Sequence, residues 1–196
     1  RILIMNCISG ENAKPHHYNM IIEKLKKYII ASGKGHTIDE CTSFELLDSL
    51  NNHYDIVYYF GCYQPLDNVL TTINKEPTNN IKDVDNVLTK KNFEILQKIP
   101  LIILNLIGSE ESQVVALHNE VYFSRYLISN CRDLECSKSF YFLKLLTKGV
   151  VEFGESVEGA FINASKYVHH QYSNRMRNNF FLSLSSSLPP SPPQKK

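Results

Sequence analysis

Cys62 is the residue that the sequence places best for nucleophilic chemistry, because it follows an apolar and aromatic run at 54–60 and a glycine at 61. In open α/β sheets, reactive groups collect beyond the carboxyl ends of the strands, and segments 6–10, 61–63 and 105–110 stand at such ends. A thiol there needs an imidazole to remove its proton, and His118 or His53 would have to supply it. The alternative is an unreactive thiol packed at a strand end, which is the interpretation we adopt.

Several other kinds of chemistry lack their motifs. Neither G-x-G-x-x-G nor G-x-x-x-x-G-K-[ST] occurs among the eight glycines, so we expect no nucleotide and no cofactor. The nucleophile elbow G-x-S-x-G is also absent. The five cysteines form no C-x-x-C pair, which argues for reduced thiols over a disulfide framework or a zinc ribbon.

Two histidine pairs and one lysine run have ordinary explanations. His16-His17 and His169-His170 are adjacent in sequence, so a helix directs the two rings of each pair to different faces, and we expect no metal site. The lysines at 24, 26, 27 and 34 are interrupted by Glu23 and lack interleaved aromatic residues. They predict a solvated helix face and no nucleic-acid partner.

Strands alternate with helices along the chain. Apolar runs predict strands at 2–5, 54–60, 101–107 and 121–128, with a short strand in 35–40. Amphipathic patterns predict helices at 17–30, 137–146 and from Ser156, and capping residues predict further helices from Thr42 and Thr89. Residues 63–88 lack a clear period and predict a long loop. Such alternation predicts an α/β fold with a mostly parallel central sheet and helices on both faces.

Composition indicates one domain at residues 1–180 and a disordered Ser/Pro-rich tail at 181–196. The 21 Lys and Arg nearly balance the 20 Asp and Glu, so no basic field favours nucleic acid. No apolar run is long enough to span a membrane or to form a signal peptide, so we expect a soluble, intracellular and cytoplasmic protein. The chain opens on a strand without an initiator methionine, and we expect it to be a piece of a longer protein.

The order of elements resembles that of caspase-like peptidases, and most closely the CHAT branch found at the C-terminus of repeat proteins. There, a strand Y-D-h-V-H-F-x-G-H-G ends on the catalytic histidine, and a second strand h-V-V-L-S-A-C-x-T-G ends on the catalytic cysteine. Here residues 54–63 read YDIVYYFGCY, VLT at 87–89 precedes a helix, and 101–109 read LIILNLIGS. Residues 142–149 and 156–164 are similar to the closing pair of helices of the family. The resemblance covers about two-thirds of the chain and implies a three-layer caspase-like sandwich.

The dyad positions are where the sequence departs from the family. The resemblance places Cys62 at the histidine position and Ile107, or Gly108 if the register shifts by one, at the cysteine position. In place of the W-P-h-x-D segment of the family, residues 128–133 read ISNCRD. Because members of a dyad act as a unit, we expect no catalytic residue and a pseudoenzyme. The implied function is an interaction or regulatory module that binds a protein partner within a longer, repeat-containing chain. The alternative is an active cysteine hydrolase or amidotransferase-like α/β enzyme that uses Cys62.

Overall fold

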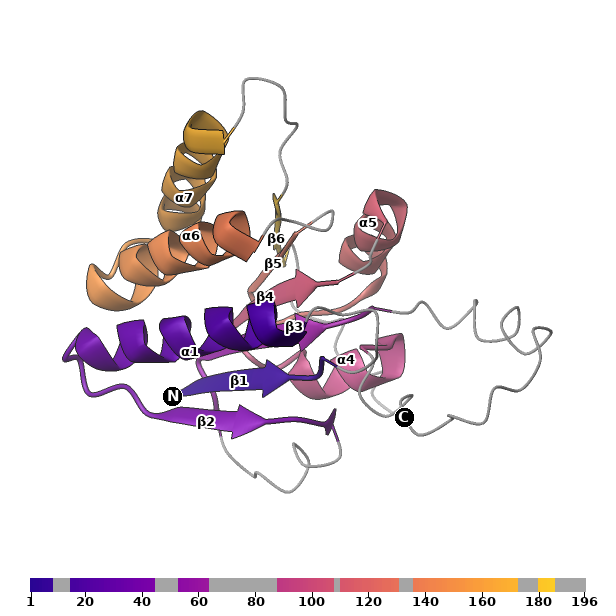
Figure 1. Ribbon diagram of the computed structural model, residues 1–196. Coiled ribbons are helices and arrows are strands. Elements are labelled where there is room, and N and C mark those ends of the chain that lie inside the picture. The colour runs from indigo at the N-terminus through magenta and orange to yellow at the C-terminus, as the bar shows by residue number, and fades with distance from the viewer. Residues whose placement is uncertain are drawn as a thin grey trace, which may run out of the picture.

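A mostly parallel sheet organises the molecule (Figure 1). The structure is a computed structural model that describes residues 1–8, 15–44, 53–63, 88–107, 110–130, 136–172 and 180–185. Its six strands follow the order β2-β1-β3-β4-β5-β6, and only β6 runs antiparallel to its neighbour. The strands are β1 (Ile2–Asn6), β2 (Ile38–Cys41), β3 (Ile56–Gly61), β4 (Leu101–Leu106), β5 (Tyr126–Asn130) and β6 (Phe180–Leu184).

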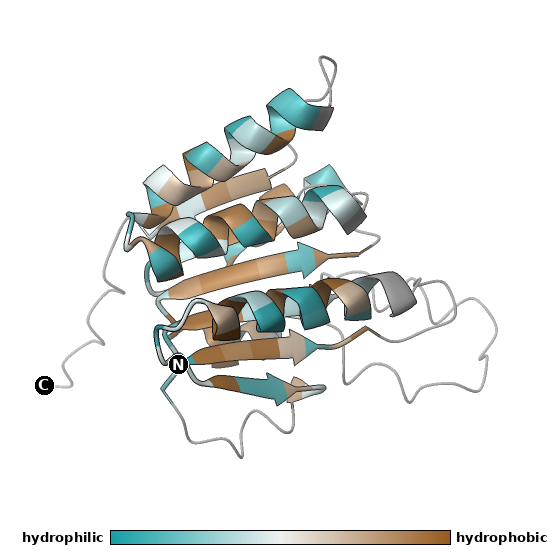
Figure 2. Ribbon diagram, turned by 60° about the vertical axis from the view of Figure 1, so that its left-hand side comes forward, coloured by the Kyte–Doolittle hydropathy of each residue, from teal (hydrophilic) through white to brown (hydrophobic). Residues whose placement is uncertain are grey.

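The central strands are apolar because both of their faces are covered. Every residue of β3 and β4 is buried, and β1 is buried except at its last position. Figure 2 shows these strands brown over most of their length. A strand buried on both faces has a continuous apolar sequence, which is why the runs at 2–5, 54–60 and 101–107 predicted them. The prediction of one mostly parallel sheet is confirmed.

Helices cover both faces of this sheet. They are α1 (Pro15–Ala31), α4 (Lys90–Leu96), α5 (Glu111–Glu120), α6 (Cys136–Thr147), the π-helix η3 (Lys148–Glu152) and α7 (Val157–Tyr172). One apolar cluster joins α1, α6 and α7 to the face that carries Tyr58 and Phe60. A second cluster joins α4 and α5 to the face that carries Val57 and Tyr59. Alternate residues of β3 therefore belong to different clusters, as the period of a strand requires.

A glycine sets the distance between η3 and α7. A Cβ added at Gly149 would lie 2.6 Å from the Cβ of Ala160. The backbone of η3 therefore approaches α7 more closely than any side chain at 149 allows. Helix α7 begins where the Ser156 hydroxyl accepts a hydrogen bond from the Gly159 amide at 3.1 Å, as the sequence predicted.

Two elements between β4 and β5 differ from the sequence prediction. Helix α5 was not predicted, because only Val114 and Leu117 of its residues are buried and the apolar period is short. The strand predicted at 121–128 begins instead at Tyr126. Its first partner, Leu101, is the first residue of β4, so residues 121–124 precede the paired region. Arg125 contributes its carbonyl, which accepts from the Ser185 amide at 3.0 Å. The chain is irregular there, and Tyr122 is exposed.

The carboxyl-terminal boundary also differs. Residues 181–184, predicted to belong to a disordered tail, form most of β6. This strand pairs antiparallel with β5, with Leu184 opposite Tyr126 and Phe180 opposite Asn130. The prediction is wrong for these residues because the partner strand lies about fifty residues earlier in the chain. Most of the predicted helix after Thr42, the loop at 64–87, Gly108 and residues 186–196 lie outside the described residues.

Candidate functional site at the carboxyl edge of the sheet

Cys62 and Ile107 stand side by side where β3 and β4 end. The two strands pair in parallel up to Gly61 and Leu106. The Ile107 amide then donates a hydrogen bond of 2.9 Å to the Gly61 carbonyl, which continues the pairing by one residue. The sequence predicted that the ends of these strands are adjacent, and the structure confirms it.

Tyr59 determines the path of the chain at Cys62. Its hydroxyl donates to the Cys62 carbonyl at 2.9 Å and accepts from the Leu88 amide at 3.0 Å. The Leu88 amide also lies 2.9 Å from the Cys62 carbonyl. A Cβ at position 61 would lie 2.5 Å from the Tyr59 hydroxyl, so Gly61 is required for this hydroxyl to occupy its place. The hydroxyl of the buried Tyr59 therefore fixes the backbone at the end of β3, where the half-buried Cys62 lies.

Ile107 brings no reactive group to this edge. It is half-buried and packs against the apolar cluster beneath α1 and α6. A branched hydrocarbon neither transfers a proton nor attacks a carbonyl carbon. The pair at the ends of β3 and β4 thus consists of one thiol and one aliphatic side chain.

Neither histidine named as a base for Cys62 lies beside it. His118, on α5, directs its ring nitrogens to the hydroxyls of Ser129 and Ser183, each at 2.7 Å. Those serines belong to β5 and β6, beyond β4 as seen from β3. His53 precedes β3 whereas Cys62 follows it, so a strand length of about 20 Å separates their backbones. The side chains of His16 and His17 lie outside the described residues.

Three asparagines lie in one row across the sheet, at or next to the ends of their strands. Asn6 and Asn105 both pair with Phe60, and Asn130 stands opposite Asn105, one residue beyond the pair Leu104–Ser129. Asn130 extends that pairing, because its side-chain oxygen accepts from the Leu106 amide at 2.6 Å and its nitrogen donates to the Leu106 carbonyl at 2.7 Å.

The other two asparagines keep unused hydrogen-bonding atoms. Asn6 donates to Asn19 at 3.1 Å, but its buried oxygen has no partner among the described residues. The Asn105 side chain is only 5% exposed, and its nitrogen likewise has no partner among the described residues. Since buried polar groups are normally satisfied, these two amides are the atoms of the edge best suited to hold a polar group. Sequence reasoning named the segments that contain them but assigned them no role.

Cys7 and Cys41 lie in the core rather than at the ends of β3 and β4. Burial, and to a smaller extent the nearby Cys41 thiol, raise the pKa of Cys7 to about 12. Cys41 is buried in the same cluster and donates a hydrogen bond of 2.8 Å to the Ser43 carbonyl. Both thiols therefore serve as small apolar groups in the core beneath α4 and α5.

No protein-family model matches the sequence, and no curated protein matches it either.

The remaining candidates from the sequence are dispersed over the surface. Within the part of the chain that the structure describes, no three His, Cys, Asp or Glu side chains gather as metal ligands. His169 and His170 are exposed on α7.

No described helix is long and apolar enough to cross a bilayer.

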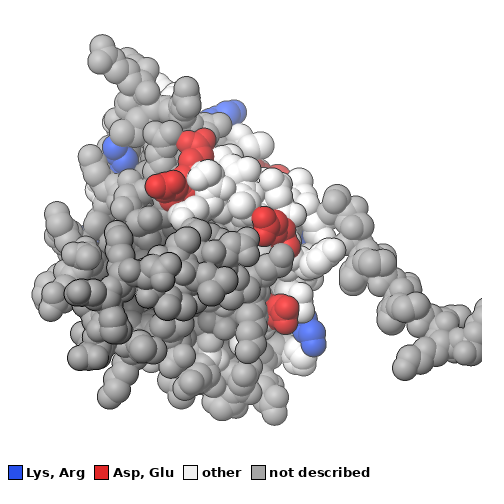
Figure 3. Space-filling view, turned by 90° about the vertical axis from the view of Figure 1, so that its right-hand side faces the viewer, with Lys and Arg blue, Asp and Glu red and all other residues white. Residues whose placement is uncertain are grey.

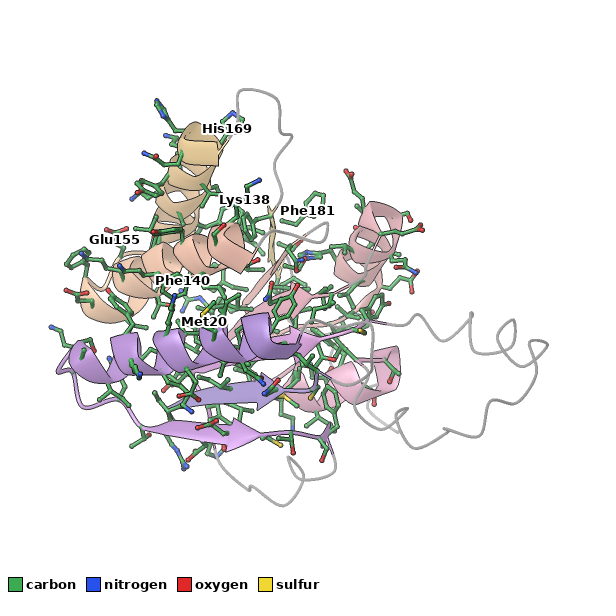
Figure 4. All side chains as sticks on the ribbon, viewed as in Figure 1. Met20, Lys138, Phe140, Glu155, His169 and Phe181 are labelled. Carbon is green, nitrogen blue, oxygen red and sulfur yellow. The ribbon has the colours of Figure 1, made fainter. Side chains whose placement is uncertain are left out.

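The lysine run does not act as one basic patch. Lys26 pairs with Glu23 at 2.6 Å and with Glu40 at 2.8 Å. The Lys24 ammonium lies 5.4 Å from the ring centroid of Phe140, which extends from α6 (Figure 4). In the view toward the carboxyl edge, the described side chains of both charges are few and scattered (Figure 3).

Proposed function

We propose that this chain is a catalytically inactive caspase-like domain, a three-layer sandwich that serves as an interaction or regulatory module of a larger protein. The parallel pairing of β3 with β4 supports it, because these strands carry the two segments that resemble the dyad strands of the family. The packing of α6 and η3 against α7 also supports it, since the close approach of Gly149 to Ala160 lies within the segments that resemble the closing helices.

The observation that carries the proposal is the pair formed by Cys62 and Ile107. They occupy neighbouring positions at the carboxyl edge, where the resemblance would place a histidine and a cysteine. A cysteine peptidase needs a thiolate and an imidazolium that protonates the leaving amine. Cys62 can supply neither the imidazole nor its acid function, and Ile107 supplies no nucleophile. A domain that keeps the framework of such a site without its reactive groups is suited to binding.

A protein partner fits the chemistry of this edge. The oxygen of Asn6 and the nitrogen of Asn105, which have no partner within the described part of the chain, are one acceptor and one donor, both uncharged. A peptide backbone presents the complementary donor and acceptor at every residue. Neutral amides also select less strongly between charged and uncharged ligands than a basic or acidic site would. This agrees with the near balance of positive and negative residues in the chain.

Thiol labelling tests the inactivity of the domain. A thiol-directed probe is applied between about pH 6 and pH 9, and peptide turnover is measured in parallel, with Cys62→Ala as the control. We expect no turnover and slow labelling of Cys62, because neither His53 nor His118 stands beside it to stabilise a thiolate. Rapid and saturable labelling below pH 7 that Cys62→Ala abolishes, or peptide cleavage that requires Cys62, would overturn the proposal in favour of an active cysteine enzyme.

Rebuilding the missing dyad tests the caspase-like placement. Cys62→His combined with Ile107→Cys puts an imidazole and a thiol at the two positions. We expect this variant to be alkylated at pH 6.5 at least tenfold faster at position 107 than the matched control, Cys62→Ala with Ile107→Cys, because a neighbouring imidazolium stabilises the thiolate. Equal rates in the two variants would contradict the placement.

A further inference from the structure

His118 joins three elements of the fold. It lies on α5, and its Nδ1 is 2.7 Å from the hydroxyl of Ser183 on β6. Its Nε2 is 2.7 Å from the hydroxyl of Ser129 on β5. Both ring nitrogens are therefore engaged within the protein, and the imidazole bridges the last two strands of the sheet.

The register explains why both hydroxyls reach the same ring. Ser183 pairs with Leu127, and Ser129 pairs with Phe181, so these four side chains lie on one face of the β5 and β6 pair. That face is the one that α5 covers, because Leu127 belongs to the cluster beneath it. The Phe181 ring centroid lies 5.9 Å from that of the imidazole, on the side of β6 toward α5 (Figure 4).

The bridge suits a neutral ring. A neutral imidazole has one donor and one acceptor, so one serine hydroxyl accepts from it and the other donates to it. A protonated ring would have two donors, so the donating hydroxyl would have to rotate and accept instead, and the added charge would lie half-buried against two neutral hydroxyls. Burial of the ring lowers the pKa of His118 from 6.5 to about 4.

The surroundings offer the charged ring little compensation. On the elements that pack around it, the described ionisable side chains are Glu111 and Glu120 on α5, and Arg125 and Tyr126 at the start of β5. Strand β6 carries none. The Tyr126 hydroxyl donates to Glu158 of α7, on the opposite face of the sheet. Neither glutamate is among the causes that shift the pKa of His118.

We propose that His118 is a pH-sensitive clasp for strand β6. The neutral ring holds β6 to β5 and α5, and protonation releases it. Release separates Phe180 from Phe142, whose rings stack with centroids 3.5 Å apart. This device is independent of whether the domain binds or cleaves peptides.

Hydrogen exchange of the β6 amides tests the clasp in the complete chain. Protection factors of residues 180–185, corrected for intrinsic exchange, are compared with those of β1 and β3 at pH 7 and pH 5. From the folded and unfolded pKa values of His118, linkage predicts that β6 loses protection about twentyfold between these pH values. Because both local release and global unfolding expose His118, β1 and β3 can lose protection by a similar factor, but they are expected to stay better protected than β6 at both pH values. Protection of β6 equal to that of β1 and β3 at pH 5 would overturn the proposal, because β6 would then open only when the whole fold unfolds.

Two substitutions and a control identify the responsible group. In His118→Gln, which keeps a donor and an acceptor but does not titrate, the additional loss at pH 5 should disappear. His170→Gln removes an exposed histidine of α7 and should keep the wild-type behaviour. If His118→Gln does not fold, Ser183→Ala replaces it, and its β6 should already be less protected at pH 7. A wild-type pH response in His118→Gln, or unchanged β6 protection in Ser183→Ala, would contradict the proposal.

Discussion

The Ile107 amide donates a hydrogen bond of 2.9 Å to the Gly61 carbonyl, one step beyond the last register pair of β3 and β4. Parallel strands that stay in register past their ends keep the following residues as neighbours, so the positions after Gly61 and Leu106 form one local site. In this chain they hold Cys62 and Ile107. These two neighbouring positions therefore carry a thiol and a hydrocarbon.

A disulfide is expected between positions 62 and 107 when Ile107 is replaced by cysteine. Neighbouring strands lie about 4.8 Å apart, which is within the range of Cα separations that disulfides span. Mild oxidation of Ile107→Cys should therefore produce an intramolecular link, detected as a cross-linked peptide by mass spectrometry. The control, Ile107→Cys with Cys62→Ala, should yield no such link. Failure of Ile107→Cys to cross-link while folded would show that the two side chains are not neighbours.

Gly61→Ala should destabilise the fold by about 2 to 3 kcal/mol, because the added methyl group overpacks the site. Its Cβ would lie 2.5 Å from the Tyr59 hydroxyl and 3.2 Å from the Cys7 carbonyl. The hydroxyl must then leave its bonds to Cys62 and Leu88. Urea unfolding measures the effect. In a Tyr59→Phe background the cost of Gly61→Ala should be smaller, and an equal cost in both backgrounds would exclude the hydroxyl as its cause.

Gly149→Ala should destabilise the protein by about 2 kcal/mol, since overpacking against Ala160 outweighs the gain in helix propensity. The new Cβ would lie 2.6 Å from the Cβ of Ala160 and 3.3 Å from its Cα. Adding Ala160→Gly removes the first contact and should restore part of the stability.

Gly159→Ala is the matched control for that experiment. The position lies in α7, and an added Cβ meets only the Ser156 hydroxyl, at 3.1 Å. Its effect on the free energy of unfolding should lie within about 0.5 kcal/mol of zero, as for most substitutions away from packed contacts. If both glycine variants lost the same stability, the close approach of η3 to α7 would not be the cause.

Stability should decline in mildly alkaline solution because of Cys7. Burial raises the pKa of Cys7 from 9.0 to about 12, so the unfolded chain releases this proton more readily than the folded one. The stabilisation of the folded state that comes from the protonated Cys7 thiol is complete below pH 8, and it is lost as the pH rises from 9 toward 12. Linkage predicts a loss of about 1 kcal/mol between pH 8 and pH 9.5. Urea unfolding of Cys7→Ala should show a flatter dependence over the same interval, and identical slopes would contradict the assignment.

The central strands and their parallel direction were accessible from the sequence because burial on both faces requires continuous apolar runs. Residues 2–5, 54–60 and 101–107 therefore predicted β1, β3 and β4, and the helices between them required parallel connections. The order of the strands in the sheet was not predicted, and the expectation that Cys62 and Ile107 are neighbours came from the family resemblance. Helix α5 and strand β6 were not predicted, because each buries only a few side chains and is stabilised by contacts with distant parts of the chain.

The sequence by itself therefore determined the α/β class, the central strands and which residues stand at their carboxyl ends, since all of these depend on local apolar patterns. Only the tertiary structure decided the surroundings of those residues. The partners of His118 depend on the antiparallel register of β5 and β6. Whether the Asn6 oxygen and the Asn105 nitrogen find partners depends on what packs around them, and none does so among the described residues. Such contacts join residues that are far apart in the chain, and the local pattern of apolar residues does not predict them.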